Sequence, residues 1–558
     1  MFRRATRRVV IVIAAAMVLS SLYSMRAADF PGSVQGIVKD SSGVPVSGAF
    51  VKLKNAERHL TFMVISQAQG RYTANDLPFG KYTVQGIGNG LQSEPAPVDV
   101  AEGRAATADV SLTANQPQML KPGMPSTRFN AGYDGGPPAT TLPDGDARGI
   151  VAQKCTQCHE IDRILNGRGD RPRWERTVRL MRDYAETGSA IVSITDEEGK
   201  LVVDYLTTNF YGTPKARAPR VDPNSRLPRT LLQGEATKYK IVEYEVPPPS
   251  RGFHEVTLDP RGNAWVSELT GGNLGKLDAK SLTFSEVPVP ALPAGSKNVI
   301  LNGMARGQGD QLWVVDPLNR RLIRHDSRTG EFNVFNVPKL KRGNPMSNSM
   351  RIHPDGSLWF TAIQSNAVVN FNPETNKFSF YDVPIAVKSA NKRSAPYGMA
   401  ISGDGKVWFA INEFDLMGRV DPSTGKVEEF PLPLKADGPI GPRKVGRDGN
   451  GNVWVGLHTI GKLMKIDYKT TKMTVYSPPT ENAGIYGMSE VKDDKIWFAE
   501  DSVDKLGRFD SKTETFVEFP LPHAETDVRR LEADPINPKR IWYSGVSTNR
   551  IGYIELID

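Results

Sequence analysis

The residues with the most specific chemistry in this sequence are its only two cysteines, Cys155 and Cys158. His159 follows directly, so the stretch has the form C-x-x-C-H. In this pattern two thiols can form thioethers with the vinyl groups of a haem, and the adjacent imidazole can bind the iron. A redox disulfide, a structural disulfide or half of a zinc site would also fit a bare C-x-x-C, but no second cysteine pair supplies further zinc ligands. The spacing predicts one covalent haem c.

Met181 is the residue expected to supply the second axial ligand of this haem. It lies in a stretch with helical spacing of apolar residues, 173–186. A thioether ligand stabilises ferrous iron and raises the reduction potential. The alternatives are an open sixth position or an ordinary core role for Met181. Arg168 and Arg171 are expected to contact the haem propionates, because guanidinium groups pair well with carboxylates.

Residues 141–212 are expected to form the helical domain that holds the haem. Helical patterns cover 146–157 and 173–186, and Thr195 with Glu198 forms a capping box at the start of a third helix. This outline resembles a small class I cytochrome c domain. The resemblance to haem domains of the quinohaemoprotein amine dehydrogenase type rests on five positions after the motif: Ile164, Arg168, Trp174, Val178 and Met181. It implies one-electron transfer to a redox partner protein.

Residues 1–28 have the pattern of a secretory signal peptide, with four arginines, then the apolar segment 9–19, then small residues. The apolar segment is short for a membrane span, so we expect no stable span after cleavage, although an uncleaved anchor is the alternative. Export predicts a periplasmic location and a periplasmic redox partner. The formal charge of +8 falls to +3 without the five arginines of this region, which argues against nucleic acid as a partner.

Residues 33–113 alternate short strand-like runs with turn signals, which predicts a small all-β sandwich. The sequence of residues 36–49 and 77–84 resembles the carboxypeptidase regulatory-like domain, a transthyretin-like sandwich. That family is grouped with carbohydrate-binding-like folds, so the resemblance implies a glycan, a small molecule or the cell envelope as a ligand. A spacer or docking module is the alternative. Linkers rich in proline and other turn residues are expected at 114–140 and 213–236.

Residues 237–558 are periodic. Tryptophans recur at intervals of 43 to 49 residues, at positions 265, 313, 359, 408, 454, 497 and 542. A period in the forties with several short strands per unit indicates a β-propeller, here with seven blades. The last unit lacks the final strand of the other units, and residues 240–247 resemble the sequence of that strand. The first strand of the region should therefore complete the last blade. The predicted fold class is mainly β, with a sandwich and a small helical domain before the propeller.

The repeat phrase of this region, Asp-Gly-x-x-Trp-Phe followed by Gly-Arg-x-Asp-Pro-x-Thr-Gly, resembles the virginiamycin B lyase (streptogramin lyase) family. The resemblance implies opening of a cyclic depsipeptide by elimination, with a histidine base and with glutamates that hold Mg²⁺ at the central opening. No compact Glu-x-His phrase allows the family's base and metal ligands to be transferred one by one. The catalytic candidates are therefore His458, His254, Glu268 and Glu500.

Several functions remain open at this point. The main hypothesis is a periplasmic c-type cytochrome that transfers single electrons, with a propeller that docks a partner or binds a substrate, because the haem motif is more specific than the propeller fold. The alternative is an enzyme centred on the propeller, either a Mg²⁺-dependent lyase of the streptogramin type or a dehydrogenase coupled to the haem. A further alternative is carbohydrate or cell-envelope binding through the sandwich.

Overall fold

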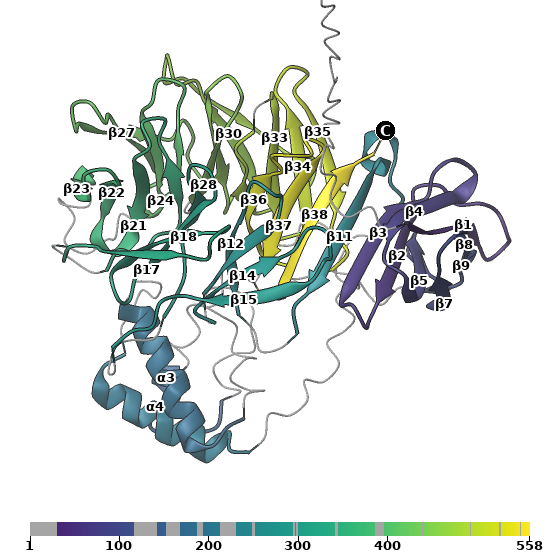
Figure 1. Cartoon of the computed structure of the whole chain (residues 1–558), viewed down its shortest axis with the longest axis horizontal. Coiled ribbons are helices and arrows are strands. Elements are labelled where there is room, and N and C mark those ends of the chain that lie inside the picture. The colour runs from purple at the N-terminus through teal and green to yellow at the C-terminus, as the bar shows by residue number, and fades with distance from the viewer. Residues whose placement is uncertain are drawn as a thin grey trace, which may run out of the picture.

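Seven antiparallel blades of four strands form most of the chain; six are separate sheets, and the seventh is part of a larger sheet (Figure 1). The computed structural model describes residues 31–115, 142–151, 168–186, 194–212, 230–247 and 251–557, the last range with short gaps in loops. In each blade the strands follow one another from the innermost to the outermost, as expected for a propeller. The chain is mainly β, as predicted.

The blades are built from consecutive strands. Blade 1 contains β12 (Phe253–Leu258), β13 (Ala264–Glu268), β14 (Asn273–Leu277) and β15 (Phe284–Pro288). Blade 2 contains β16 (Met304–Arg306), β17 (Gln311–Asp316), β18 (Arg321–Asp326) and β19 (Phe332–Asn336). Blade 3 contains β20 (Met350–Ile352), β21 (Leu358–Ala362), β22 (Ala367–Asn372) and β23 (Lys377–Asp382). Blade 4 contains β24 (Pro396–Ile401), β25 (Val407–Ile411), β26 (Leu416–Val420) and β27 (Val427–Pro431).

The last three blades complete the circle. Blade 5 contains β28 (Pro442–Arg447), β29 (Val453–Leu457), β30 (Lys462–Ile466) and β31 (Met473–Tyr476). Blade 6 contains β32 (Ile485–Met488), β33 (Lys495–Glu500), β34 (Lys505–Asp510) and β35 (Thr515–Pro520). Blade 7 contains β36 (Val528–Ala533), β37 (Arg540–Gly545), β38 (Arg550–Leu556) and β11 (Tyr239–Glu245). Because β11 pairs with β38 along its whole length, the predicted closure by the first strand is confirmed.

The repeated tryptophans are framework residues. All seven are at most 5% exposed. Several donate their indole N–H to the residue that ends the inner strand or its turn, as Trp454 does to Asp448 at 2.9 Å and Trp542 to Asp534 at 2.9 Å. Since a buried indole favours both apolar contact and a hydrogen-bond acceptor, these bonds help to fix the tryptophans in their blades.

The N-terminal domain shares a sheet with the propeller. Its strands are β1 (Gly32–Asp40), β2 (Phe50–Asn55), β3 (Leu60–Ile65), β4 (Arg71–Leu77), β5 (Gly80–Gly88), β6 (Leu91–Gln92), β7 (Ala96–Val100), β8 (Ala106–Thr107), β9 (Val110–Leu112) and β10 (Ala114–Asn115). They form two packed layers, as predicted for a β-sandwich. The free edge of β3 pairs antiparallel with β11, so one sheet of ten strands runs from the sandwich into blade 7.

The described helical elements between sandwich and propeller are α1 (Arg148–Ile150), α3 (Arg171–Glu186) and α4 (Asp196–Asn209). The predicted capping box at α4 is confirmed, since the Glu198 backbone N–H donates to Thr195 Oγ1 at 3.2 Å and the Thr195 N–H donates to Glu198 Oε2 at 2.8 Å. The structure does not show a cytochrome domain here, because the C-x-x-C-H stretch lies outside the described residues.

Short 3-10 turns are η1 (Ala68–Gly70), η5 (Gly234–Thr237), η6 (Ile363–Ser365) and η7 (Asn412–Phe414). None of the described helices combines the length and apolar character that a bilayer crossing requires.

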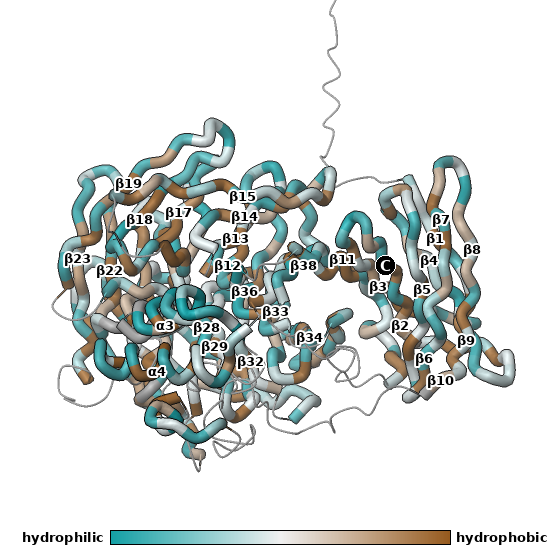
Figure 2. The backbone as a smooth tube through the Cα atoms, turned by 90° about the horizontal axis from the view of Figure 1, so that it is seen from below, coloured by the Kyte–Doolittle hydropathy of each residue, from teal (hydrophilic) through white to brown (hydrophobic). Residues whose placement is uncertain are grey.

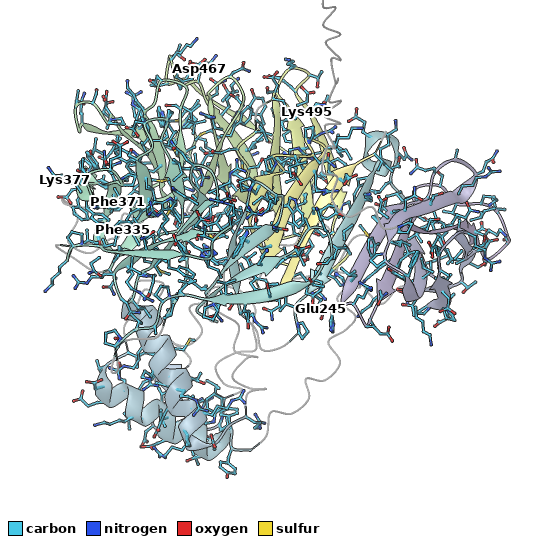
Figure 3. All side chains as sticks on the ribbon, viewed as in Figure 1. Glu245, Phe335, Phe371, Lys377, Asp467 and Lys495 are labelled. Carbon is cyan, nitrogen blue, oxygen red and sulfur yellow. The ribbon has the colours of Figure 1, made fainter. Side chains whose placement is uncertain are left out.

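One face of the propeller is the face at which the inner strands begin. Glu245 at the end of β11 lies level with Val528 at the start of β36, through the pairing of β38 and β37. Figure 3 shows Glu245 on the side opposite to Asp467 and Lys495. In Figures 1 and 2, α3 and α4 lie over the Glu245 side. We call this side the entry face.

Candidate functional site

The inner strands of five blades carry a β-bulge close to the entry face. In β24, Pro396 pairs with Ile411 and Met399 pairs with Phe409, so two residues of the inner strand face a single residue of β25. The same shift occurs in the inner strands of blades 1, 5, 6 and 7. A bulge breaks the strict alternation of side chains between the two faces of a strand. Consecutive residues such as Arg443 and Lys444 can therefore both reach residues of other blades.

Each blade carries one polar residue at or just before the start of its inner strand. Six of these residues stand eleven positions before the blade's tryptophan, and the seventh stands thirteen before. We call the set the rim ring: His254, Asn302, Asn348, Tyr397, Arg443, Tyr486 and Arg529. The rim ring contains two guanidinium groups and no carboxylate, so it suits a ligand that carries negative charge or develops it.

Four members of the rim ring come into contact across blades 4 to 7. The hydroxyl groups of Tyr397 and Tyr486 are hydrogen-bonded to each other. The Arg443 guanidinium carbon lies 5.0 Å from the centre of the Tyr397 ring and 5.7 Å from that of the Tyr486 ring. On the far side, Arg529 lies 5.5 Å from the Tyr486 ring centre. A pair of phenols therefore sits between two cations.

The two phenols have different acidities because their surroundings differ. Burial opposes ionisation of Tyr397, but the charges of Arg443, Arg529 and Lys444, together with the hydrogen bond to Tyr486, hold its pKa below the ordinary value. Burial raises the pKa of Tyr486 well above the ordinary value, and the neighbouring Tyr397 raises it further. Two neighbouring titratable groups whose pKa values are pushed apart are suited to act as a base and an acid.

His458 lies directly behind this pair, just after β29. Its ring meets the Tyr486 ring edge to face, with 5.6 Å between the centres, and its Nε2 lies 3.2 Å from Asp501 Oδ1. The predicted candidate His458 thus lies beside the tyrosine pair. The imidazole packs against the Tyr486 ring and holds it in place, while Asp501 orients the imidazole.

Below the rim ring, buried ion pairs meet across the channel. Lys444 is hydrogen-bonded to the carboxylate of Glu255 on the other side of the channel, and to the backbone carbonyl of Asn348. Arg351 donates to Glu490 Oε1 at 2.6 Å. Burial alone would raise the pKa of Glu255, but Lys444, His254 and Arg530 together lower that pKa to about 2. Because each charge is paired, Lys444, Glu255 and Arg351 can remain ionised although they are buried.

His254 belongs to the rim ring but is not placed as a base. Its side chain is 2% exposed, and its Nδ1 lies 3.2 Å from Glu255 Oε1. Burial lowers its pKa to about 4. The imidazole is therefore a buried neutral partner of the ion-pair layer.

Glu268 and Glu500 lie outside the rim ring, at the ends of β13 and β33. Burial raises the pKa of Glu268 to about 7, with a further contribution from Glu286 of the same blade. Burial also raises the pKa of Glu500 well above its ordinary value, and Glu518 of blade 6 adds to the shift. The structure does not bring either glutamate together with His254 or His458.

The described donor set does not fit the Mg²⁺ site that the resemblance implied. In the ranges that the structure describes, no group of three or more histidine, cysteine, aspartate or glutamate side chains is arranged to hold a metal ion. Glu268 and Glu500 stand on blades 1 and 6, and each faces another carboxylate of its own blade. We therefore assign no chemical step to a bound metal.

The residues expected to bind haem are only partly described. Cys155, Cys158 and His159 lie outside the described residues, so the haem attachment stays a prediction. Met181 lies half-buried on α3, and its role as an iron ligand also stays a prediction.

The two arginines expected at the haem propionates have protein partners. Arg171 forms ion pairs with Asp204 and with Glu175, the latter at 3.7 Å. The guanidinium carbon of Arg168 lies 5.3 Å from the centre of the Phe210 ring. Their contacts with propionates stay predictions, because the attachment motif itself is not described.

Sequence reasoning missed Tyr397, Arg443, Tyr486 and Arg529. The signal that could have found them is positional, since each stands at nearly the same distance before its blade's tryptophan. Because the residue type differs from blade to blade, the set forms no motif that a reader of the sequence would recognise.

Comparisons with known proteins agree with this architecture. Residues 293–557 match the virginiamycin B lyase family, and residues 33–113 match the carboxypeptidase regulatory-like domain. The structure of selenomethionine-substituted virginiamycin B lyase from Staphylococcus aureus is 20% identical, with a TM-score of 0.50 over 57% of this chain and 100% of that chain. A streptogramin B lyase structure is 21% identical, with a TM-score of 0.51 over 58% of this chain and 100% of that chain. No curated protein matches the chain.

These findings identify two parts of the chain, a carboxypeptidase regulatory-like domain and a virginiamycin B lyase-like propeller. They overturn the main functional hypothesis, that of a periplasmic cytochrome whose propeller serves an electron carrier. Neither matched family is a cytochrome, and the matches cover the propeller and the sandwich. The haem motif spans only five residues, whereas the lyase-like repeat extends over most of the propeller.

Proposed function

We propose that the propeller is a lyase that breaks a carbon–oxygen bond by β-elimination at the rim ring. One observation carries this proposal: the hydroxyl groups of Tyr397 and Tyr486 are hydrogen-bonded between the guanidinium groups of Arg443 and Arg529. The relatives of the propeller are named as lyases, which supports the same reaction class.

Tyr397 would act as the general base. An elimination starts when a base removes the proton from a carbon next to a carbonyl group, and it is fastest when the pKa of the base lies near the working pH. The cations beside Tyr397 favour its phenolate form. The same guanidinium groups can stabilise the negative charge that develops on the carbonyl oxygen.

Tyr486 would act as the general acid. Its raised pKa keeps it protonated while Tyr397 is ionised. The electron pair of the broken carbon–hydrogen bond forms the new carbon–carbon double bond, the carbon–oxygen bond breaks, and the leaving oxygen takes the proton of Tyr486. Transfer of the proton on Tyr397 back to Tyr486, along their hydrogen bond or through solvent, resets the site. Nothing is oxidised or reduced, and no water is consumed.

His458 would be a positioning residue for Tyr486. Its edge-to-face contact fixes the Tyr486 ring, and Asp501 fixes the imidazole in turn. Supporting groups of this kind keep a reactive pair within the narrow range of geometry that proton transfer requires.

The experiment is a screen of the whole chain against esters and glycosides that have a leaving oxygen β to a carbonyl group, with a streptogramin B depsipeptide among them. Mass spectrometry and ultraviolet absorbance separate elimination from hydrolysis, because elimination gives a conjugated alkene and adds no water. We expect an unsaturated product with the wild-type chain and none with Tyr397→Phe. Products that contain an added water, formed equally by the wild type and the variant, would refute the proposal.

A further inference from the structure

We infer that the substrate is an organic acid whose carboxylate binds Arg443 at the rim ring, with the leaving oxygen on the carbon β to that carboxylate. This inference rests on the proposed elimination and names its substrate class. A 4-linked uronate residue in a polysaccharide and a free β-alkoxy acid share this chemistry.

The charge balance of the rim ring supports an anionic ligand. Arg529 is paired with Asp527 through two contacts of 3.1 and 3.2 Å. Arg443, in contrast, has no carboxylate partner among the residues that the structure describes, and its Nε is buried without a hydrogen bond. A buried N–H without an acceptor costs free energy, and a carboxylate that accepts from this guanidinium would remove that cost.

The ion-pair layer below cannot neutralise Arg443. Glu255 already binds Lys444, Glu490 binds Arg351, and Glu532 binds Arg530 at 2.6 Å. Glu255, Arg351, Lys444 and Arg530 are buried and come from four different blades, so they meet beneath the rim ring. An anion that arrives from the entry face would therefore stop at the rim ring.

Access to the rim ring from solvent also fits this placement. Tyr397, Arg443 and Arg529 are half-buried, whereas Tyr486, Lys444 and Arg530 are buried. The cationic group that lacks an acidic partner is thus among the residues that a dissolved ligand can reach.

The proposed reaction favours a carboxylate over other anions. Removal of a proton next to a carboxylate places a second negative charge on the same group, so the reaction is slow unless cations neutralise it. Two guanidinium groups beside the base supply that neutralisation. A phosphate ester would satisfy Arg443, but it offers no carbonyl to delocalise the charge of the carbanion.

The test is binding of defined probes to the full chain by titration calorimetry. The probes are sodium polygalacturonate, its methyl-esterified form, and free D-galacturonate, so that the polymer and the monomer are distinguished as sources of the acid. We expect an acid probe to bind, the neutral ester to bind at least about tenfold more weakly, and Arg443→Met to weaken acid binding by a similar factor. Arg443→Lys should fall between the two, because a single ammonium cannot bind the carboxylate in a bidentate way.

The matched control is Arg306→Met, which removes an exposed arginine of the inner strand of blade 2. It should bind as the wild type does. The thermal midpoint of each variant checks that it is folded. Equal binding of acid and ester, unchanged binding by a folded Arg443→Met, or no binding of either acid probe would overturn the inference.

Binding and turnover separate this inference from the proposed function. Acid binding that depends on Arg443 without an unsaturated product would support the substrate class and refute the elimination. Turnover of a neutral ester, together with no binding of the acid, would support the elimination and overturn the substrate class.

Discussion

The hydroxyl group of Tyr397 on blade 4 is hydrogen-bonded to the hydroxyl group of Tyr486 on blade 6, across the Arg443 side chain of blade 5. Since this bond joins the proposed base to the proposed acid, Tyr397→Phe should lower kcat by about 10²- to 10⁴-fold, the usual contribution of a general base. It should change the free energy of unfolding by only about 1 kcal/mol, the value of one hydrogen bond. Steady-state kinetics and urea unfolding measure the two effects.

Tyr381→Phe is the control for this variant, because Tyr381 lies on the outer strand of blade 3, away from the rim ring. It should leave kcat unchanged. Full activity of Tyr397→Phe would remove Tyr397 from the mechanism.

The pH dependence of kcat/KM should show the unequal acidities of the two tyrosines. Activity should rise as Tyr397 loses its proton, at a pH below its ordinary value of 10.0, because Arg443 and Arg529 lower its pKa against the effect of burial. It should fall only at higher pH, where Tyr486 loses its proton. Arg443→Met should move the rising limb to higher pH. Lys444 also faces Tyr397, but it is present in both proteins and cannot produce the difference. A rising limb at the same pH in both proteins would contradict this assignment.

Glu255→Gln should destabilise the propeller by about 3 to 5 kcal/mol, because it leaves the buried Lys444 without its counter-charge. The pKa of Glu255 is lowered from 4.5 to about 2, so the stability that its charge provides is present above pH 4.5 and is lost as the pH falls towards 2. The difference between wild type and variant should therefore shrink in acid. Urea unfolding at several pH values measures it, with the exposed Glu374→Gln as control.

Glu268→Gln should behave in the opposite way. The pKa of Glu268 is raised from 4.5 to about 7 by burial and by Glu286, so its ionisation costs stability increasingly from pH 4.5 up to about 7. Above pH 7 the variant should be more stable than the wild type by about 1 to 3 kcal/mol, and below pH 4.5 the two should be equal. Because Glu268 lies outside the rim ring, the variant should keep its lyase activity. A loss of activity at full stability would restore Glu268 as a catalytic candidate.

Much of the fold could be predicted from the sequence, because local signals repeat. The tryptophan period predicted the blades, and the missing last strand predicted closure by β11. The site could not be predicted in the same way. Strict alternation would send Arg443 and Lys444 to opposite faces of β28, and only the bulge lets both reach other blades. Tyr397 and Tyr486 stand 89 positions apart and meet only because the blades close into a circle.

The junction of the two β domains was also missed, since an edge strand carries no signal for its partner. Strand β3 pairs with β11 residue by residue, with Met63 opposite Ile241. Apolar residues of both domains cover the joint sheet on each face, with Val64 and Val242 in one cluster and Met63 and Ile241 in the other. The regulatory-like domain is therefore continuous with the core of blade 7.

This continuity predicts that sandwich and propeller unfold together. Met63→Ala, a change within the sandwich, should cost about 2 to 5 kcal/mol and lower the unfolding midpoint of the propeller as well. Tryptophan fluorescence measures this directly, because seven of the eight tryptophans lie in the propeller and none lies in the sandwich. Val44→Ala, at a sandwich residue that is 56% exposed, should leave the midpoint unchanged. If Met63→Ala changed the circular dichroism transition of the sandwich but not the tryptophan transition, the two domains would be independent, and the shared sheet would carry no cooperativity.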